Sequence, residues 1–144
     1  ILFLTACSGV QSEVKKNWQN DVSTLNIEDL TVKNYNLMDA GTRLHKTLED
    51  SIGKTGFQLV GEEANFHLKY KIVEYDSGSP LGRIATLGVS YSAQAKLRVK
   101  VALYNEDEMV GGWEVNSWLK GGLSDKKLFA KAAEEIAGHL KGDL

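Results

Sequence analysis

The longest strictly alternating stretch of the chain, residues 89–103, constrains the fold more than any other feature. Apolar residues occupy every second position, and the residues between them, from Ser90 to Lys100, are polar or basic. A period of two places the two kinds of side chain on opposite faces of a β-strand. The stretch therefore predicts a sheet with one buried face, which other elements must cover.

Shorter segments predict the neighbours of this strand. Residues 65–75 alternate in the same way, and residues 109–119 follow the polar turn at 105–108, so they should return antiparallel as a hairpin. Residues 57–60 predict a short strand. Residues 24–32 predict a first strand that is only weakly hydrophobic.

Two stretches have the 3.6-residue period of a helix with one apolar face. Asn36 is a candidate N-cap for the first helix and Gly53 its stop, and Ser124 is a candidate N-cap for the second. The apolar positions are Leu37, Ala40, Leu44, Leu48 and Ile52 in the first, and Leu128, Phe129, Ala132, Ala133, Ile136, Ala137 and Leu140 in the second.

The predicted order is strand, helix, strand, strand, strand, strand, helix, and a chain of 144 residues has room for one such domain. This order predicts an α+β fold, with a mainly antiparallel sheet of four or five strands and two helices packed on one face. The formal net charge of -2 gives no basic domain for nucleic acid.

The first residues predict a membrane anchor. Leu4, Thr5, Ala6 and Cys7 follow an apolar run, and Cys7 is the single cysteine of the chain. This segment resembles the bacterial lipobox, which implies a lipid on the Cys7 sulfur and removal of residues 1–6 as the remnant of a signal peptide. The alternative is an apolar N-terminal strand in which Cys7 is a small hydrophobic residue.

The lipobox resemblance implies a domain plan and a location. Residues 7–22 would be the lipidated cysteine and a polar tether, and residues 23–144 a single periplasmic domain. Ser8 after the cysteine is consistent with sorting to the outer membrane. The membrane is therefore one expected partner.

Basic residues predict an interaction surface on the sheet. Lys96, Arg98 and Lys100 alternate on one strand, Lys69 and Lys71 on another, and pairing of these strands would gather all five on the open face. An acidic partner, such as another envelope protein or lipid headgroups, would fit this face. The alternative is an ordinary solvated face, with Glu74 and Glu114 offsetting charge. Trp118 is a candidate contact residue, with packing against the tether as its alternative.

No pattern predicts catalysis. His45, His67 and His139 lie on three different elements without a second ligand at metal spacing, so we expect no metal or other cofactor. The glycine-rich loop, residues 76–88, lacks the ending of a phosphate-binding loop. Its Arg83 is a candidate loop site. We expect a protein that is not an enzyme.

The region from Arg43 to Leu140 is similar to a family of uncharacterised bacterial envelope lipoproteins. The matching residues are Gly56 and Phe57, then Gly78, Arg83 and Gly88, then Ala132 and Ala133. The layout also resembles small periplasmic domains of the curli-secretion channel and of lipoproteins that activate peptidoglycan synthases, which bind other proteins. The resemblance implies a structural or interaction module of the envelope. The alternative is a protein that binds a small molecule or glycan under the loop, beside Tyr75 and Tyr91.

Overall fold

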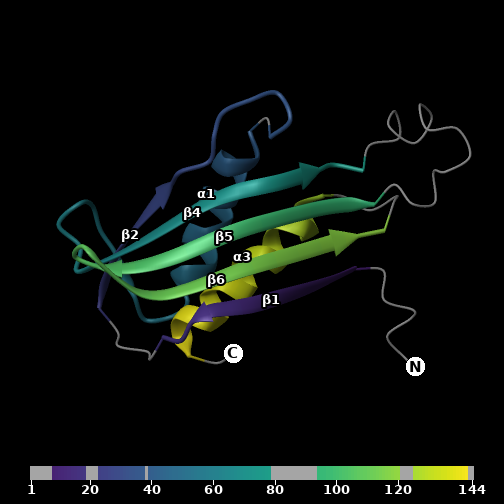
Figure 1. Cartoon of the computed structure of the whole chain (residues 1–144). Coiled ribbons are helices and arrows are strands. Elements are labelled where there is room, and N and C mark those ends of the chain that lie inside the picture. The colour runs from purple at the N-terminus through teal and green to yellow at the C-terminus, as the bar shows by residue number, and fades with distance from the viewer. Residues whose placement is uncertain (1–7, 19–22, 38, 79–93, 121–124, 143–144) are drawn as a thin grey trace, which may run out of the picture.

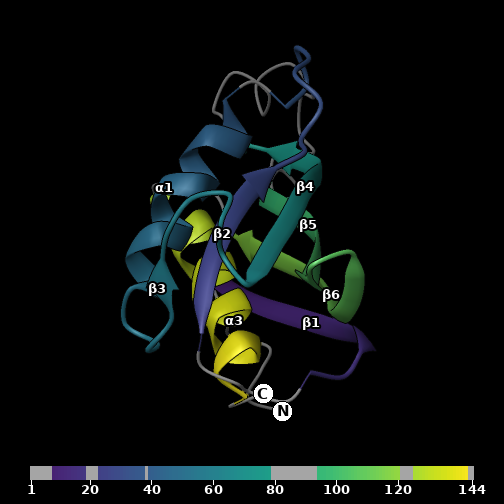
Figure 2. The same cartoon turned by 90° about the vertical axis from the view of Figure 1, so that its left-hand side faces the viewer.

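In the part of the chain that the structure describes, six strands lie side by side in one sheet, and two helices lie against one of its faces (Figures 1 and 2). The computed structural model describes residues 8–18, 23–37, 39–78, 94–120 and 125–142. In chain order the elements are β1 (Ser8–Lys16), β2 (Thr24–Asp29), α1 (Ala40–Ile52), β3 (Gln58–Leu59), β4 (Phe66–Asp76), β5 (Ala95–Asn105), β6 (Glu108–Leu119) and α3 (Lys126–Lys141).

The strand order across the sheet is β1-β6-β5-β4-β2-β3. The first four are antiparallel neighbours, whereas β2 runs parallel to both β4 and β3. The predicted α+β class is confirmed, but the sheet has six strands and is mixed instead of four or five mainly antiparallel strands. The crossover through α1 accounts for the parallel pairs, because a helix between two strands carries the chain back to the edge at which the first began.

Strand β1 was not expected, because the sequence pattern led us to place residues 8–16 in a tether. The strand pairs with β6 over nearly its whole length, from Ser8 opposite Leu119 to Lys16 opposite Gly112. Val10 and Val14 are four residues apart, and this spacing puts two side chains on one face of either a strand or a helix. The period of the segment was therefore ambiguous. The polar residues between them belong to an edge strand with one solvated face.

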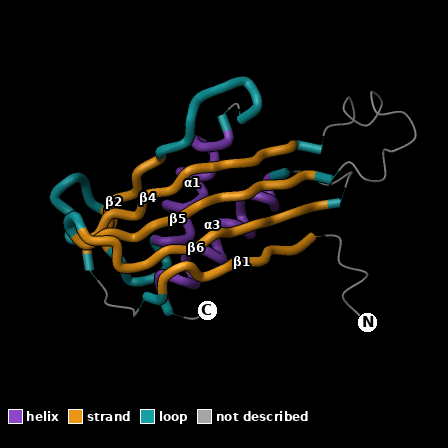
Figure 3. Tube along the Cα trace, in the orientation of Figure 1, coloured by secondary structure: helices purple, strands orange, loops and turns teal. Residues whose placement is uncertain are grey.

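The predicted hairpin is confirmed as β5 and β6, which pair from Ala95 opposite Leu119 to Asn105 opposite Glu108 (Figure 3). Residues 89–93 of the long alternating stretch lie outside the described residues. Glu106 forms the turn with φ of 58°, in the left-handed region that glycine adopts most easily.

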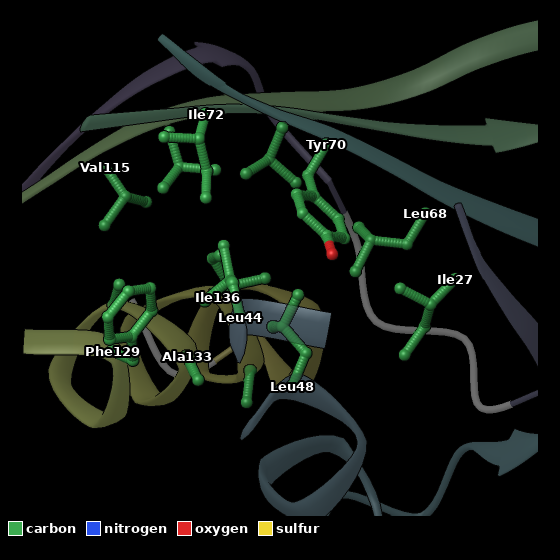
Figure 4. Packing of buried hydrophobic residues seen from close by; sticks show 14 of the residues in the cluster. Ile27, Leu44, Leu48, Leu68, Tyr70, Ile72, Val115, Phe129, Ala133 and Ile136 are labelled. Atoms are coloured by element: carbon green, nitrogen blue, oxygen red, sulfur yellow. The ribbon is translucent and has the colours of Figure 1, made fainter. Parts of the chain in front are cut away.

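The apolar stripes of both predicted helices are buried, and they pack against the inner face of the sheet (Figure 4). The first helix begins at Ala40 and not near Asn36, because the side chain of Asn34 accepts the N–H of Leu37 and holds that residue in a turn. Asp125 occupies the N-cap position of α3. Ser124 lies outside the described residues.

Trp18 closes one end of the core. Its indole N–H donates to the carbonyl of Leu140 at 3.0 Å, and its ring meets Phe66 edge-on at 5.3 Å between centroids. The segment after β1 is thus part of the packed domain. Among the helices in the described ranges, none is long and apolar enough to cross a bilayer.

Candidate functional site

The open face of the sheet brings together the basic residues that alternation singled out. In the antiparallel register of β4 and β5, Lys71 lies opposite Lys100, Lys69 opposite Ala102 and Glu74 opposite Arg98. Figure 2 shows that both helices lie on the other side of the sheet. All five predicted cations, Lys69, Lys71, Lys96, Arg98 and Lys100, therefore share one uncovered surface, which we call the open basic face.

Carboxylates neutralise part of this face. Arg98 forms ion pairs of 3.7 Å with Glu74 of β4 and with Glu114 of β6. Lys69 lies 4.0 Å from Glu28 of β2 and 4.7 Å above the ring centroid of Tyr104. These contacts account for Arg98 and Lys69 as ordinary cross-strand pairs.

Lys71 and Lys100 differ from those two cations, because they lie directly opposite each other and neither forms an ion pair with a described residue. On its other side Lys100 lies opposite Glu114 of β6, so Lys71 is the less compensated of the two. Like charges in this position destabilise a sheet. Beside them is a shallow depression of about 210 Å³, whose apolar part comes from Leu30, Ala102 and Tyr104. Leu30 is 53% exposed. An acidic group with a small apolar neighbour would suit both parts of this surface.

Trp118 lies on the same face, opposite Lys96 in β5 and Gly9 in β1. A side chain on Gly9 would overlap the ring of Trp118, so the indole packs on the bare backbone of Gly9. The predicted contact residue is therefore half-buried against β1, the segment expected to be a tether. Lys96 and Trp118 also line a smaller hollow with Asn116.

A second polar cluster joins the two helices to β4. The guanidinium of Arg43 binds both carboxylate oxygens of Asp125, at 2.8 and 3.0 Å, and the Tyr75 hydroxyl donates to the same carboxylate at 2.7 Å. The guanidinium carbon lies 4.2 Å from the ring centroid of Phe129. Planar bidentate pairing of this kind fixes geometry as well as charge.

These contacts shift the titration of all three groups. Hydrogen bonds from Arg43, and then from Tyr75, lower the pKa of Asp125, and the bond to Asp125 raises the pKa of Arg43. Burial, assisted by the hydrogen bond to Asp125, raises the pKa of Tyr75 to about 12. The Tyr75 hydroxyl is therefore engaged in a structural cluster. Tyr91, its companion in the expected ligand site, lies outside the described residues.

Ser12, Glu135 and His139 form a third cluster, between β1 and α3. The Ser12 hydroxyl donates to Glu135 at 2.5 Å and lies 2.8 Å from Nε2 of His139. The hydroxyl has one proton, so Nε2–H of His139 donates to the serine oxygen. A histidine in that role cannot take the proton of the serine, and its ring is 5% exposed and stacked on Trp113. The cluster fastens β1 to the helix layer.

The remaining predicted positions fall into two groups. Within the described ranges, no three His, Cys, Asp or Glu side chains gather closely enough to hold a metal ion. His45 lies near Glu49, and His67 lies near Asn26 and Glu28. Leu4, Thr5, Ala6, Cys7 and Arg83 lie outside the described residues.

Comparison with known proteins gives a match in fold. No protein-family model and no curated protein matches the sequence. A variant of the PelC dodecamer from Paraburkholderia phytofirmans matches with a TM-score of 0.62 and 9% identity, over 93% of this chain and 97% of that chain. A second crystal form of the PelC dodecamer from this organism gives a TM-score of 0.58 and 10% identity over the same shares. The fold is similar to that of PelC.

At this identity the likeness to PelC concerns the fold alone. Sequence reasoning found the open basic face because alternation along a strand assigns each residue to a face. It missed the Arg43–Asp125 and Ser12–His139 contacts, whose partners are 82 and 127 residues apart. No local spacing signals such pairs.

Proposed function

We propose that this chain is a lipid-anchored protein of the bacterial envelope, held in the outer membrane by Cys7, and that its domain is a docking module without catalytic activity. The lipobox resemblance at Leu4, Thr5, Ala6 and Cys7 supports the anchor. The observation that carries the docking role is the pair Lys71 and Lys100 on the open basic face. Its mutual repulsion is relieved when an acidic partner binds.

The depression beside this pair describes the partner further. Leu30, Ala102 and Tyr104 offer apolar surface within reach of the lysines. Its volume of about 210 Å³ is below the several hundred Å³ typical of small-molecule sites. We therefore favour an acidic protein segment that places one small apolar group between carboxylates over an enclosed small molecule.

Site-specific photocrosslinking in cells tests the docking role. A photoreactive phenylalanine at Tyr104 on the open basic face should give an adduct, and the same group at Tyr35, which is 87% exposed elsewhere, should not. Adding Lys71→Glu and Lys100→Glu should abolish the Tyr104 adduct. An adduct that survives charge reversal, or equal adducts at the two tyrosines, would contradict the proposal.

Labelling with radioactive palmitate tests the anchor separately. The wild-type chain expressed in a bacterial envelope should incorporate label, and Cys7→Ala should not. Absence of label from the wild type would refute the lipid anchor. The docking test at Tyr104 would be unaffected by that result.

A second copy of this chain is a candidate for the acidic partner. The turn Glu106, Asp107 and Glu108 carries three exposed carboxylates at the far end of β5 and β6, and the PelC structures are dodecamers. Light scattering should then give a mass above that of one chain for the wild type. Lys71→Glu with Lys100→Glu should give the mass of a single chain, and a single-chain mass for both would exclude this partner.

A further inference from the structure

The first residue of β1 identifies the end of the domain to which a lipid on Cys7 would connect. Ser8 lies opposite Leu119 at the end of β6, and Leu119 lies opposite Ala95 at the start of β5. Cys7 directly precedes Ser8 in the sequence, so the chain enters the described domain at this end of the sheet. We call it the Cys7 end, which is on the right in Figure 1.

Four exposed lysines lie at the Cys7 end. Lys120 directly follows β6, and Lys127 lies in the first turn of α3. Neither makes an ion pair within the part of the chain that the structure describes. Lys126 and Lys96 add two more cations at this end.

The described carboxylates at the Cys7 end lie beside cations other than Lys120 and Lys127. Asp125 is held by Arg43, Glu74 is held by Arg98, and Asp76 lies opposite Lys96. Only Asp39, at the start of α1, lacks such a basic counterpart among the described residues of this end. In the sequence, residues 79–93 and 121–124, which join these elements, contain Arg83 and no acidic residue.

The opposite end of the domain carries a group of exposed carboxylates. The β5–β6 turn carries Glu106, Asp107 and Glu108, and the segment before β4 carries Glu62 and Glu63, all of them exposed. Lys15, Lys16 and Lys54 also lie at that end and offset part of this negative charge, so the Cys7 end is the more positive of the two.

Two lysines lie in the first turn of α3, where a helix disfavours positive charge. Lys126 and Lys127 are the first two residues of α3, and its first turn contains no acidic residue. The N-terminus of a helix carries partial positive charge, so cations there destabilise the fold. An anionic surface just beyond the helix would make the same lysines favourable.

We propose that the Cys7 end rests on anionic phospholipid headgroups, so that the domain stands on the membrane with its strands pointing away from the surface. This inference rests on the proposed lipid on Cys7, which brings the lysines to the headgroups. The acidic β5–β6 turn then faces away from the bilayer. The open basic face stands upright and remains accessible to a neighbouring protein.

Fluorophores at the two ends of β5 test the orientation. Gln94→Cys places a label at the Cys7 end and Asp107→Cys places one in the turn, and β5 between them has 11 residues, a length of about 36 Å. The introduced cysteine is the free thiol of the lipidated protein, because the sulfur of Cys7 carries the lipid. A headgroup-bound quencher in vesicles should quench label 94 and spare label 107. Equal quenching at both positions would overturn the orientation.

Vesicle binding of the chain carrying Cys7→Ser tests the chemistry without the lipid. Vesicles containing phosphatidylglycerol should bind it, and vesicles of phosphatidylcholine alone should not. Lys120→Gln with Lys127→Gln should weaken binding about fivefold per lysine. The control pair Lys16→Gln with Lys54→Gln, at the opposite end, removes the same charge and should leave binding within about twofold. Equal losses from both pairs would overturn the proposal.

The two proposals fail in different experiments. If palmitate does not label the wild type, the anchor is wrong, whereas the Cys7→Ser chain still reports on the lysines. If palmitate labels the wild type but the lysine pairs behave alike on phosphatidylglycerol, the anchor stands and the resting surface is wrong.

Discussion

At the scale of single residues, Lys71 is the side chain whose charge acts most clearly against the stability of the fold. It lies directly opposite Lys100 in the sheet, without an ion pair in the described structure. We expect Lys71→Gln to raise the free energy of unfolding by about 0.5 kcal/mol, because it removes a like-charge pair. Urea denaturation at low ionic strength measures the change.

Lys69→Gln is the matched control on the same strand. Lys69 faces Ala102 across the sheet and lies 4.0 Å from Glu28, so neutralising it removes a weak attraction and no repulsion. Its free energy of unfolding should stay the same or fall slightly. A loss of stability in Lys71→Gln that equals the loss in Lys69→Gln would contradict the assigned repulsion.

Asp125 should make the free energy of unfolding depend on pH in the acid range. Its folded pKa is lowered by Arg43 and Tyr75, so the carboxylate stabilises the fold at neutral pH, and that contribution disappears as pH falls below about 4 toward the folded pKa. Asp125→Asn should therefore lower the free energy of unfolding by about 1–2 kcal/mol at pH 7 and by less below pH 4. Denaturant titrations at several pH values measure the difference.

Asp50→Asn provides the comparison for Asp125→Asn. Asp50 is an exposed residue of α1, and no ion pair joins it to a described residue. Its substitution should change stability by less than about 0.5 kcal/mol at either pH. A constant difference between wild type and Asp125→Asn from pH 7 to pH 3 would argue against the Arg43 pairing.

Residues whose role depends only on the strand face they occupy could be predicted from sequence. Residues whose role depends on a partner far away in the sequence could not. The open basic face was predictable because Lys96, Arg98 and Lys100 occupy alternate positions of one strand and therefore lie on the same face. The role of Arg43 depends on Asp125, and nothing near either residue indicates the other. The same is true of Ser12 and His139.

At the scale of elements, the β5–β6 turn carries strain at Glu106. This residue has φ of 58°, which costs an L side chain about 1–2 kcal/mol and costs glycine little. We expect Glu106→Gly to raise the midpoint of thermal unfolding by a few degrees. Scanning calorimetry measures the midpoint.

Asp107→Gly controls for the loss of a carboxylate in the same turn. Asp107 does not have positive φ, so glycine there relieves no strain and adds disorder to the unfolded chain. Its midpoint should fall. An equal rise in both variants would assign the effect to charge and not to the backbone.

Helices and strands with a clear hydrophobic period could be predicted from sequence. The direction in which neighbouring strands pair was less predictable. Both helical stripes and the β5–β6 hairpin follow directly from spacing. Whether β2 runs parallel or antiparallel to β4 is not encoded in alternation, since both arrangements bury every second residue. Strand β1 was missed because its apolar residues, Val10 and Val14, also fit a helix.

At the scale of the whole molecule, the folded unit includes residues that the sequence pattern assigned to a tether. Removing residues 1–22 would expose the edge of β6, remove Trp18 from the core end, and leave His139 without Ser12. We expect this shortened chain to lose several kcal/mol of stability and to self-associate through β6. Circular dichroism with light scattering measures both.

Removing residues 1–7 alone is the matched control, since it keeps β1 intact. This longer chain should unfold cooperatively at nearly the same denaturant concentration as the full sequence. If both shortened chains were equally stable, β1 would contribute nothing to the fold.

The direct entry of the chain into β1 at Ser8 limits how far the molecule can reach. The lipid that we propose on Cys7 would be followed at once by a paired strand and leave no slack, so the domain would sample only a layer on the order of 40 Å deep above the bilayer. The domain would then meet partners by lateral diffusion in the plane of the membrane. A partner must either be anchored in the same leaflet or reach the membrane surface.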